Sequence, residues 1–114
     1  MLTFFQIVLG GGIGAGARYL VGLAVPFPFG TLAVNVIGSA LIGWLWATLA
    51  PKDHALLPFL TTGILGGFTT FSAFSLDTFK LVEKGAFGFA GAYVAASLLL
   101  SLAACFATIA WVRA

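Results

Sequence analysis

The sequence predicts an all-α membrane protein with four transmembrane helices, and three observations support this fold class. Of its 114 residues, 61% are hydrophobic and 7% are charged, whereas a soluble domain is about 25% charged. Mean hydropathy is +1.16. The charges leave four uncharged stretches, residues 1–17, 19–51, 55–76 and 85–112, and about 20 apolar helical residues cross a bilayer core. We therefore expect residues 1–114 to form a single four-helix domain. This composition excludes a soluble enzyme, a nucleic-acid binder and an attached soluble domain.

The first two expected segments are separated by a proline-rich loop. The first runs from Leu2 to Val25 and ends at Pro26–Gly30, where two prolines and a glycine mark a loop. The second runs from Thr31 to Ala50 and is followed by the polar turn Pro51–His54. We expect no secretory signal, because the first charge is Arg18 and further apolar segments follow it.

The third segment, expected over Ala55–Phe79, is predicted to be broken near its middle. Seven of the ten positions from Thr61 to Thr70 are glycine or threonine, which are poor in helix interiors. Backbone freed at membrane depth must be buried in protein or line a wet cavity, so the pair Gly66-Gly67 indicates a break with free carbonyls. A kinked but continuous helix that packs through small residues explains the same pattern equally well. The charged connection Lys80–Gly85 then leads to the fourth segment, Ala86–Val112.

The balance of basic residues bears on orientation in the membrane. Four crossings place both termini on one side, together with Lys52 and Arg113. The other side carries Lys80 and Lys84, and also Arg18 if its side chain reaches that interface. Orientation normally follows an excess of Lys and Arg on one side, and almost none exists here. Either a partner sets the orientation, or the chain inserts both ways and forms an antiparallel homodimer with its twofold axis in the membrane plane.

The glycines of the first segment have two interpretations. Gly10, Gly12 and Ala15 match a dinucleotide-binding fingerprint, but that motif needs a preceding strand, a βαβ unit and a later acidic residue. We reject it in favour of helix packing, in which Gly10 pairs with Gly14 and Gly12 with Gly16. The same role is expected for Gly38, Gly43 and Gly91.

No catalytic or zinc-binding arrangement is expected. The chain has one cysteine, Cys105, and one histidine, His54, and they lie far apart in the sequence. A single cysteine forms no intrachain disulfide, and this pair does not supply a usual zinc site. A Ser–His–Asp arrangement is also hard to build. The sequence therefore predicts a protein that is not an enzyme.

Intramembrane polar groups are the candidates for function, because they are expensive in a bilayer. Thr31, Asn35 and Ser39 recur every four residues and share one helix face, which makes them candidates for a pathway lining. The Asn35 amide could donate to an anion or form a hydrogen bond between helices. Arg18 could serve an anion vestibule or extend toward the interface from its helix end.

Two phenylalanines follow the expected break. Phe71 and Phe74 are three residues apart and share a helix face. Their default role is packing, but the ring edge is the positive end of an aromatic quadrupole. Ring edges interleaved with hydroxyl groups could hold a small anion weakly, and conduction requires an ion to leave as well as to enter. No lysine or arginine lies at the expected midpoint to trap it.

Three motifs resemble the CrcB/Fluc family of fluoride channels. Residues 11–19 are similar to the family's glycine-rich motif that ends in Arg-Tyr, residues 30–39 to its G-T-L-x-V-N-x-x-G-[ST] motif, and residues 63–74 to its G-x-x-G-G-x-T-T-F-S-T-F motif. Together they cover the chain in the family's order. The resemblance implies a dual-topology homodimer in a bacterial plasma or inner membrane. It also implies two antiparallel pathways through which fluoride leaves the cytoplasm passively.

The resemblance also implies roles for individual residues. The family threonine between the two phenylalanines is Ala73 here, which removes one hydroxyl from the implied lining. Ser97 and Ser101 share a face of the fourth segment and would extend the hydroxyl track. The implied fluoride-pathway residues are Asn35, Phe71, Phe74, Ser72, Thr31 and Tyr93; Arg18 would lie near the vestibule, and Gly66 and Thr69 would offer backbone carbonyls to a structural sodium ion on the dimer axis.

Two other functions are alternatives to a channel. A proton-coupled exporter of lipophilic cations, resembling the small multidrug resistance family, needs a carboxylate in the first segment, and residues 1–25 contain none. A non-transporting membrane protein, such as an assembly partner or a holin-like protein, needs neither Asn35 nor a broken third segment. Asn35→Asp separates the hypotheses, because a fixed negative charge should block an anion pathway. No nucleic acid and no soluble protein partner are implied.

Overall fold

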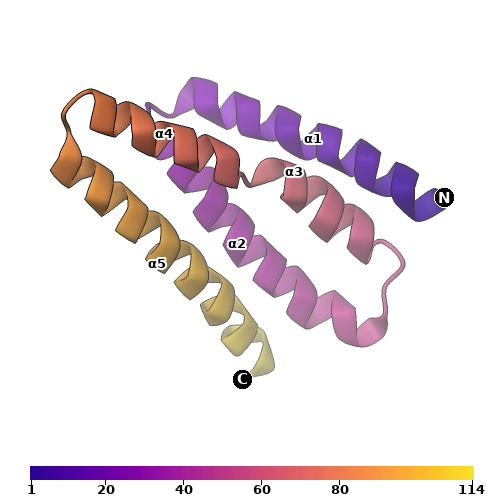
Figure 1. Cartoon of the computed structure of the whole chain (residues 1–114). Coiled ribbons are helices and arrows are strands. Elements are labelled where there is room, and N and C mark those ends of the chain that lie inside the picture. Colours follow the sequence, from indigo (N-terminus) through magenta and orange to yellow (C-terminus); the bar gives the residue numbers. More distant parts are fainter.

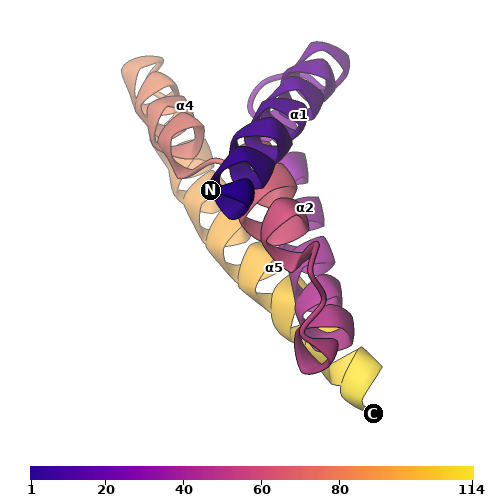
Figure 2. The same cartoon turned by 90° about the vertical axis from the view of Figure 1, so that its right-hand side faces the viewer.

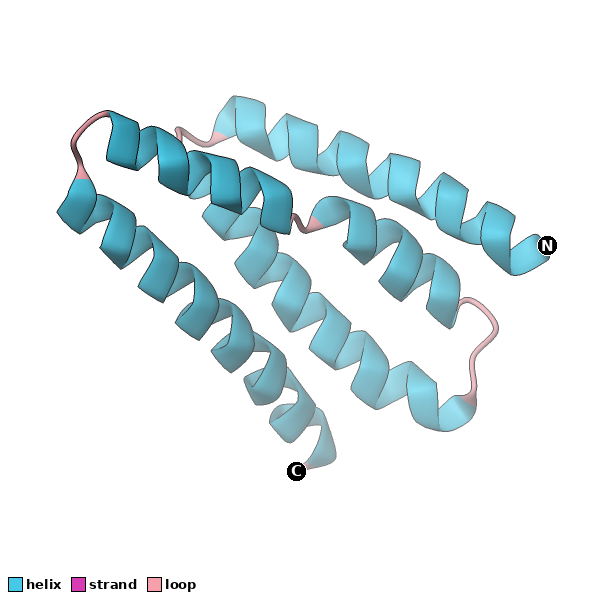
Figure 3. Ribbon diagram, in the orientation of Figure 1, coloured by secondary structure: helices cyan, strands magenta, loops and turns pink.

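A computed structural model describes all residues, 1–114, as helices joined by short loops (Figures 1 and 3). Four of the helical segments are long and apolar enough to cross a membrane. The expected all-α architecture with four crossings is therefore confirmed. These segments are Leu2–Ala24, Phe29–Lys52, Phe59–Glu83 and Phe87–Arg113.

The first two helices agree with the sequence except at the proline-rich loop. Helix α1 spans Leu2–Ala24, and α2 spans Phe29–Leu49 before a 3₁₀ turn at Ala50–Lys52. Helix α2 therefore begins two residues earlier than expected. Pro28 occupies its N-cap position, where proline is compatible with a helix because the first N–H groups have no intrahelical partner.

The third segment is broken, as expected, but the break lies two residues after the glycine pair. A π-helical turn, η2 (Phe59–Leu65), leads into the short α3 (Gly66–Phe68). The chain is then extended at Thr69 and Thr70 before α4 (Phe71–Glu83) begins. The prediction of a broken helix is confirmed, and its placement at Gly66-Gly67 is wrong.

Threonine hydroxyl groups, rather than glycines, account for the position of the break. Thr69 Oγ1 donates to the Leu65 carbonyl at 2.9 Å, at the end of α3. Thr70 Oγ1 accepts from the Ala73 N–H at 3.1 Å, which makes Thr70 the N-cap of α4. Gly67 remains helical, and a Cβ there would collide with the Gly11 carbonyl. The glycine therefore permits close packing against α1.

The charged connection expected at Lys80–Gly85 is mostly helical, because α4 continues to Glu83. Gly85 has φ +78°, the left-handed conformation that favours glycine. Its N–H donates to the Val82 carbonyl, and the Ala86 N–H donates to the Leu81 carbonyl, both at 2.9 Å. This is a Schellman motif, and α5 (Phe87–Arg113) follows at once.

The helices form a thin bundle with a small core. Helix α1 lies against η2 and α3, whereas α2 runs along α5 (Figure 1). Helix α4 packs against α5 and diverges from α1 in the second view (Figure 2). Only 16 of the 114 residues are buried, and large apolar side chains are exposed along every long helix, as expected where lipid replaces water. The buried cluster consists of Phe74, Leu81, Ala90 and Tyr93.

Only some of the small-residue contacts expected from the sequence are present. Gly10 and Gly14 are buried where α1 crosses the third segment, and a Cβ at either would meet its backbone. Gly38 packs against Thr69, and Gly43 against α5. The expected role is therefore confirmed at these four positions. Open space adjoins Gly12, Gly16 and Gly91.

The tryptophans lie near the end of the bundle that carries the two termini. Both termini lie opposite the loops that join α1 to α2 and α4 to α5 (Figure 1). Trp44, Trp46 and Trp111 are exposed near the ends of α2 and α5. This placement is typical of an interfacial aromatic belt.

Candidate functional site

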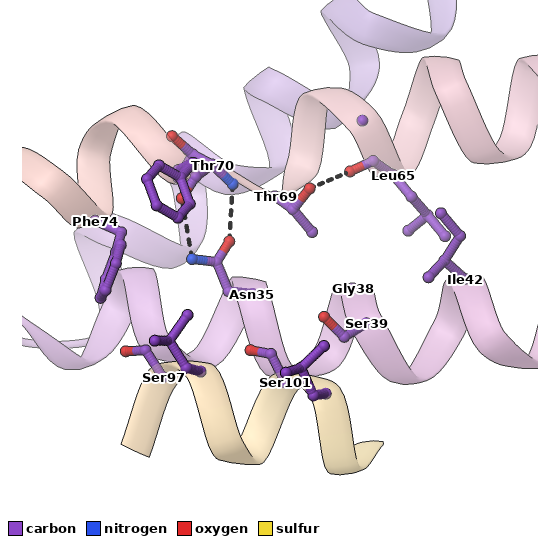
Figure 4. Close-up of a pocket in the computed structure, with 14 residues that line it drawn as sticks. Asn35, Gly38, Ser39, Ile42, Leu65, Thr69, Thr70, Phe74, Ser97 and Ser101 are labelled. Carbon is purple, nitrogen blue, oxygen red and sulfur yellow. Dashed lines mark hydrogen bonds between the residues drawn. The ribbon is translucent and has the colours of Figure 1, made fainter. Parts of the chain in front are cut away.

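A cavity of about 410 Å³ lies where α2, the broken third segment and α5 meet (Figure 4). It brings together Asn35, Phe71 and Phe74 from the predicted pathway with Gly66 and Thr69 from the predicted cation site. The other residues around it are Gly38, Ser39, Ile42, Leu65, Thr70, Ser97, Leu98, Ser101 and Leu102. The cavity has no charged lining residue, so polar contacts to an anion would come from hydroxyl groups, amides and backbone.

Asn35 joins α2 to the break through two hydrogen bonds. Its Nδ2 donates to the Thr70 carbonyl at 3.0 Å, and its Oδ1 accepts from the Thr70 N–H at 2.8 Å (Figure 4). The amide thus gives the Thr70 N–H and carbonyl the hydrogen-bond partners that a continuous helix would provide. A primary amide has two N–H donors, and these contacts use one. Asn35 therefore bonds between helices while one donor remains for a ligand.

The same contacts free two carbonyls at the break. In a continuous helix the Gly66 carbonyl would accept from the N–H of residue 70, and the Thr69 carbonyl from that of residue 73. Those N–H groups donate instead to Asn35 Oδ1 and Thr70 Oγ1. Gly66 and Thr69 are the two residues expected to offer carbonyls to a cation. Carbonyl oxygens suit hard cations, so these residues fit that group.

The two phenylalanines that follow the break are in contact but differ in exposure. Their ring centroids are 5.3 Å apart, with planes at 64° in an edge-to-face arrangement. Phe74 is buried at 7% exposure and also contacts the Tyr93 ring at 5.4 Å. Phe71 is 72% exposed. The rings of Phe71, Phe74 and Tyr93 thus contact one another in sequence, from the exposed edge of the cavity at Phe71 to the buried Tyr93.

Two serines on α5 contribute buried hydroxyl groups with no partner. Ser97 and Ser101 lie one turn apart on the side of α5 that faces α2 (Figure 4). Neither Oγ atom forms a hydrogen bond, and Ser97 is only 5% exposed. Buried polar groups normally have partners, so these hydroxyl groups are available to a ligand in the cavity.

A second polar cluster, which sequence analysis missed, joins three helices near one end of the bundle. Asp77 on α4 is buried, with 8% exposure. Its Oδ2 accepts from Thr31 Oγ1 at 2.6 Å and from the Tyr93 hydroxyl at 3.3 Å. A hydroxyl group has one proton to donate. Thr31 and Tyr93, both implied to lie along the fluoride pathway, therefore donate that proton to Asp77 in this arrangement.

A pattern in the sequence could have revealed Asp77. Asp77 follows Phe74 by three residues and precedes Leu81 by four, a spacing that places all three on one helix face. All three are buried in α4. No role was predicted for Asp77 from the sequence, and its inward position is a finding of the structure.

Arg18 reaches the third segment rather than extending only toward the helix end. Its Nε donates to the Gly67 carbonyl at 3.1 Å. Arg18 also lines a second cavity, of about 290 Å³, together with Tyr19 and Thr31. Positive charge thus lies close to the break but outside the cavity that contains Asn35.

The residues between the phenylalanines contribute less to the cavity than expected. Ser72 is exposed and is not among the lining residues; its Oγ is 3.3 Å from Thr70 Oγ1. Ala73, which replaces the family threonine, donates its backbone N–H to Thr70 Oγ1. The nearby Ser75 donates to the Phe71 carbonyl and does not replace the missing hydroxyl in the lining.

Comparison with known proteins gives a consistent result. Residues 5–109 match the family described as CrcB-like protein, Camphor Resistance (CrcB). The chain is 51% identical to the fluoride-specific ion channel FluC of Cereibacter sphaeroides, with 97% of this chain and 94% of that protein covered. Identity is 50% to the FluC of Agrobacterium fabrum, covering 96% and 95%, and 53% to that of Paracoccus denitrificans, covering 90% and 87%. These matches confirm the resemblance and, with the four apolar helices, indicate a multi-pass bacterial membrane protein.

Proposed function

Because the chain belongs to the CrcB family, whose matched members are named as ion channels and not as enzymes, we propose that it is a passive, selective fluoride channel. One observation carries this proposal. About half of the residues, over nearly the whole chain, are identical to those of proteins named as fluoride-specific ion channels. Flow is down the electrochemical gradient. Fluoride that accumulates in the cytoplasm therefore leaves through the protein without a coupled energy source.

The proposed pathway follows the uncharged cavity and the polar cluster beside it. The second N–H of Asn35, the free hydroxyl of Ser97 and the edges of Phe71 and Phe74 are the groups available to an anion. None carries a full charge, so each holds fluoride weakly enough for it to leave. The route continues past Thr31 and Tyr93 where their hydroxyl groups turn from Asp77 toward the anion. Arg18 attracts anions toward a vestibule. Ser72 joins the lining only where a second chain covers the exposed side of α4.

The proposed assembly is an antiparallel homodimer with two antiparallel pores. Phe71 is 72% exposed at the cavity edge, and a pore open sideways to lipid would not retain a hydrated path for an ion. A second copy can close that edge. The near equality of basic residues at the two ends supports insertion in both orientations, and the twofold axis then relates two equivalent cavities.

A structural sodium ion is proposed on the dimer axis, held by the Gly66 and Thr69 carbonyls. The observation in its favour is that both carbonyls have lost their helical donors at the break. Two oxygens from one chain are few for a hard cation. An axis that passes beside the break brings the same pair from the second copy. The ion would neutralise the partial charges of these carbonyls and hold the two breaks together.

The test is ion efflux from liposomes that contain the purified protein and are loaded with fluoride or chloride. An ion-selective electrode should record rapid loss of fluoride and no loss of chloride. Folded protein that releases no fluoride would overturn the proposal. Equal loss of both ions would retain a pore and refute its selectivity.

Asn35→Asp is the residue-specific arm of this experiment. The carboxylate keeps an acceptor for the Thr70 N–H but places a second oxygen against the Thr70 carbonyl. It also introduces a fixed negative charge into the cavity. We expect fluoride efflux to be abolished. Unimpaired efflux would remove Asn35 from the pathway, and Asn35→Ala, which adds no charge, measures the effect of losing the bridge alone.

A further inference from the structure

A basic cluster lies at the end of the bundle opposite the termini, and its residues line neither the cavity of Asn35 nor that of Arg18. The Lys84 ammonium lies 4.9 Å from the centroid of the Phe27 ring, and the Lys80 ammonium lies 5.9 Å from the same centroid. Lys80 lies in the last turn of α4 and Lys84 is its C-cap residue, whereas Phe27 comes from the loop between α1 and α2. Two positive charges thus share one aromatic ring.

The contacts within the cluster leave its charge incompletely compensated. A cation over an aromatic ring is weakly stabilised at an exposed site, and the C-terminal end of a helix also favours positive charge. Neither effect removes the repulsion between two like charges. Glu83, at the end of the same helix, is exposed and supplies one negative charge near two positive charges. The arrangement favours an anion with several oxygens that can contact both lysines.

The surroundings of the cluster indicate the source of that anion. Phe27 is 42% exposed, and Leu23 in the last turn of α1 and Phe87 at the start of α5 are each 68% exposed. The cluster therefore lies at the helix ends, where exposed apolar side chains adjoin the lysine ammonium groups. In a membrane protein this level corresponds to the lipid headgroups. An anion held here has its phosphate beside the lysines and its acyl chains beside exposed apolar side chains.

We propose that Lys80, Lys84 and Phe27 form a binding site for the phosphate of an anionic phospholipid. The ring holds both lysine side chains in place, so their ammonium groups are positioned before the lipid arrives. Juxtamembrane lysines are each attracted to anionic lipid. The site does not depend on the fluoride proposal, because it lies outside the cavity and requires no ion flux.

The experiment measures the thermal unfolding midpoint of the protein in neutral detergent after addition of phosphatidylglycerol, phosphatidylcholine or inorganic phosphate. Phosphatidylglycerol should raise the midpoint more than phosphatidylcholine does. The combined variant Lys80→Gln and Lys84→Gln should lose at least half of this difference. The matched control, Lys52→Gln with Arg113→Gln, removes the same charge at the opposite end and should keep it.

Two results would overturn the proposal. One is a full phosphatidylglycerol response in the combined Lys80→Gln and Lys84→Gln variant. The other is an equal response to inorganic phosphate, which would identify a site for free anions. If the combined variant does not fold, Phe27→Leu decides the question, because it keeps both charges and removes the ring that positions them. An undiminished response in Phe27→Leu would refute the site as described, whatever the outcome for fluoride.

Discussion

The hydroxyl group of Ser97 is buried and has no hydrogen-bond partner, which allows a test of ligand binding at the scale of one residue. Ser97→Ala removes a donor that stabilises nothing in the protein, so the unfolding midpoint should stay unchanged or rise. If the hydroxyl contacts fluoride, its loss removes a hydrogen bond to an ion, worth about 1.5–3 kcal/mol. We therefore expect fluoride efflux from liposomes to fall about tenfold or more.

Ser75→Ala is the matched control for this prediction. The Ser75 hydroxyl is exposed and donates to the Phe71 carbonyl within α4. Its removal should leave both stability and efflux near those of the unmodified protein. A normal efflux rate in Ser97→Ala, with the midpoint unchanged, would exclude that hydroxyl from the pathway.

Asp77 gives a second prediction for single residues, concerning stability. Its short hydrogen bond from Thr31 measures 2.6 Å, and the bond from Tyr93 is longer at 3.3 Å. Thr31→Val keeps the side-chain shape and removes the shorter bond, so it should lower unfolding stability by about 1.5–3 kcal/mol. Tyr93→Phe should cost less. Equilibrium unfolding of both variants in detergent checks the order, and a larger loss in Tyr93→Phe would contradict it.

At the scale of the elements, the break in the third segment depends on side chains that end one helix and begin another. Thr70→Val removes the N-cap hydroxyl of α4 but leaves the backbone that Asn35 contacts. We expect a loss of about 1 kcal/mol in unfolding stability. Thr70→Ser, which retains the hydroxyl, should restore most of it.

Thr78→Val provides the comparison for that N-cap. The Thr78 hydroxyl donates to the Phe74 carbonyl inside α4 and does not begin a helix. Its loss should change stability by less than the loss of the Thr70 hydroxyl. Equal effects in thermal unfolding would show that the cap does not determine where α4 begins.

The break also shows which parts of the fold and site can be predicted from sequence. The threonines and glycines indicated an interrupted helix, because their propensities are local properties. Its position depends on the hydroxyl contacts of Thr69 and Thr70 and also on contacts between distant residues, because Gly67 meets Gly11 and Asn35 bonds Thr70. The Asp77 cluster was missed for the same reason, since it forms only where α2, α4 and α5 meet.

At the scale of the whole molecule, the prediction concerns the orientation of the chain in the membrane. The cavity is open beside Phe71, and Lys and Arg are nearly equal in number at the two ends, so an antiparallel dimer is expected. With Cys105 replaced by alanine, a single cysteine can be introduced at Ala55 or at Glu83, which are exposed at opposite ends of the bundle. A membrane-impermeant thiol reagent applied to intact cells should label about half of either variant, because a dual-topology population presents each end to both sides in equal numbers. Permeabilised cells give the full extent of labelling as the control. A chain with one orientation would instead be labelled almost completely at one position and hardly at all at the other. That result would rule out the antiparallel dimer and leave the open edge beside Phe71 to be covered by parallel copies or by another protein.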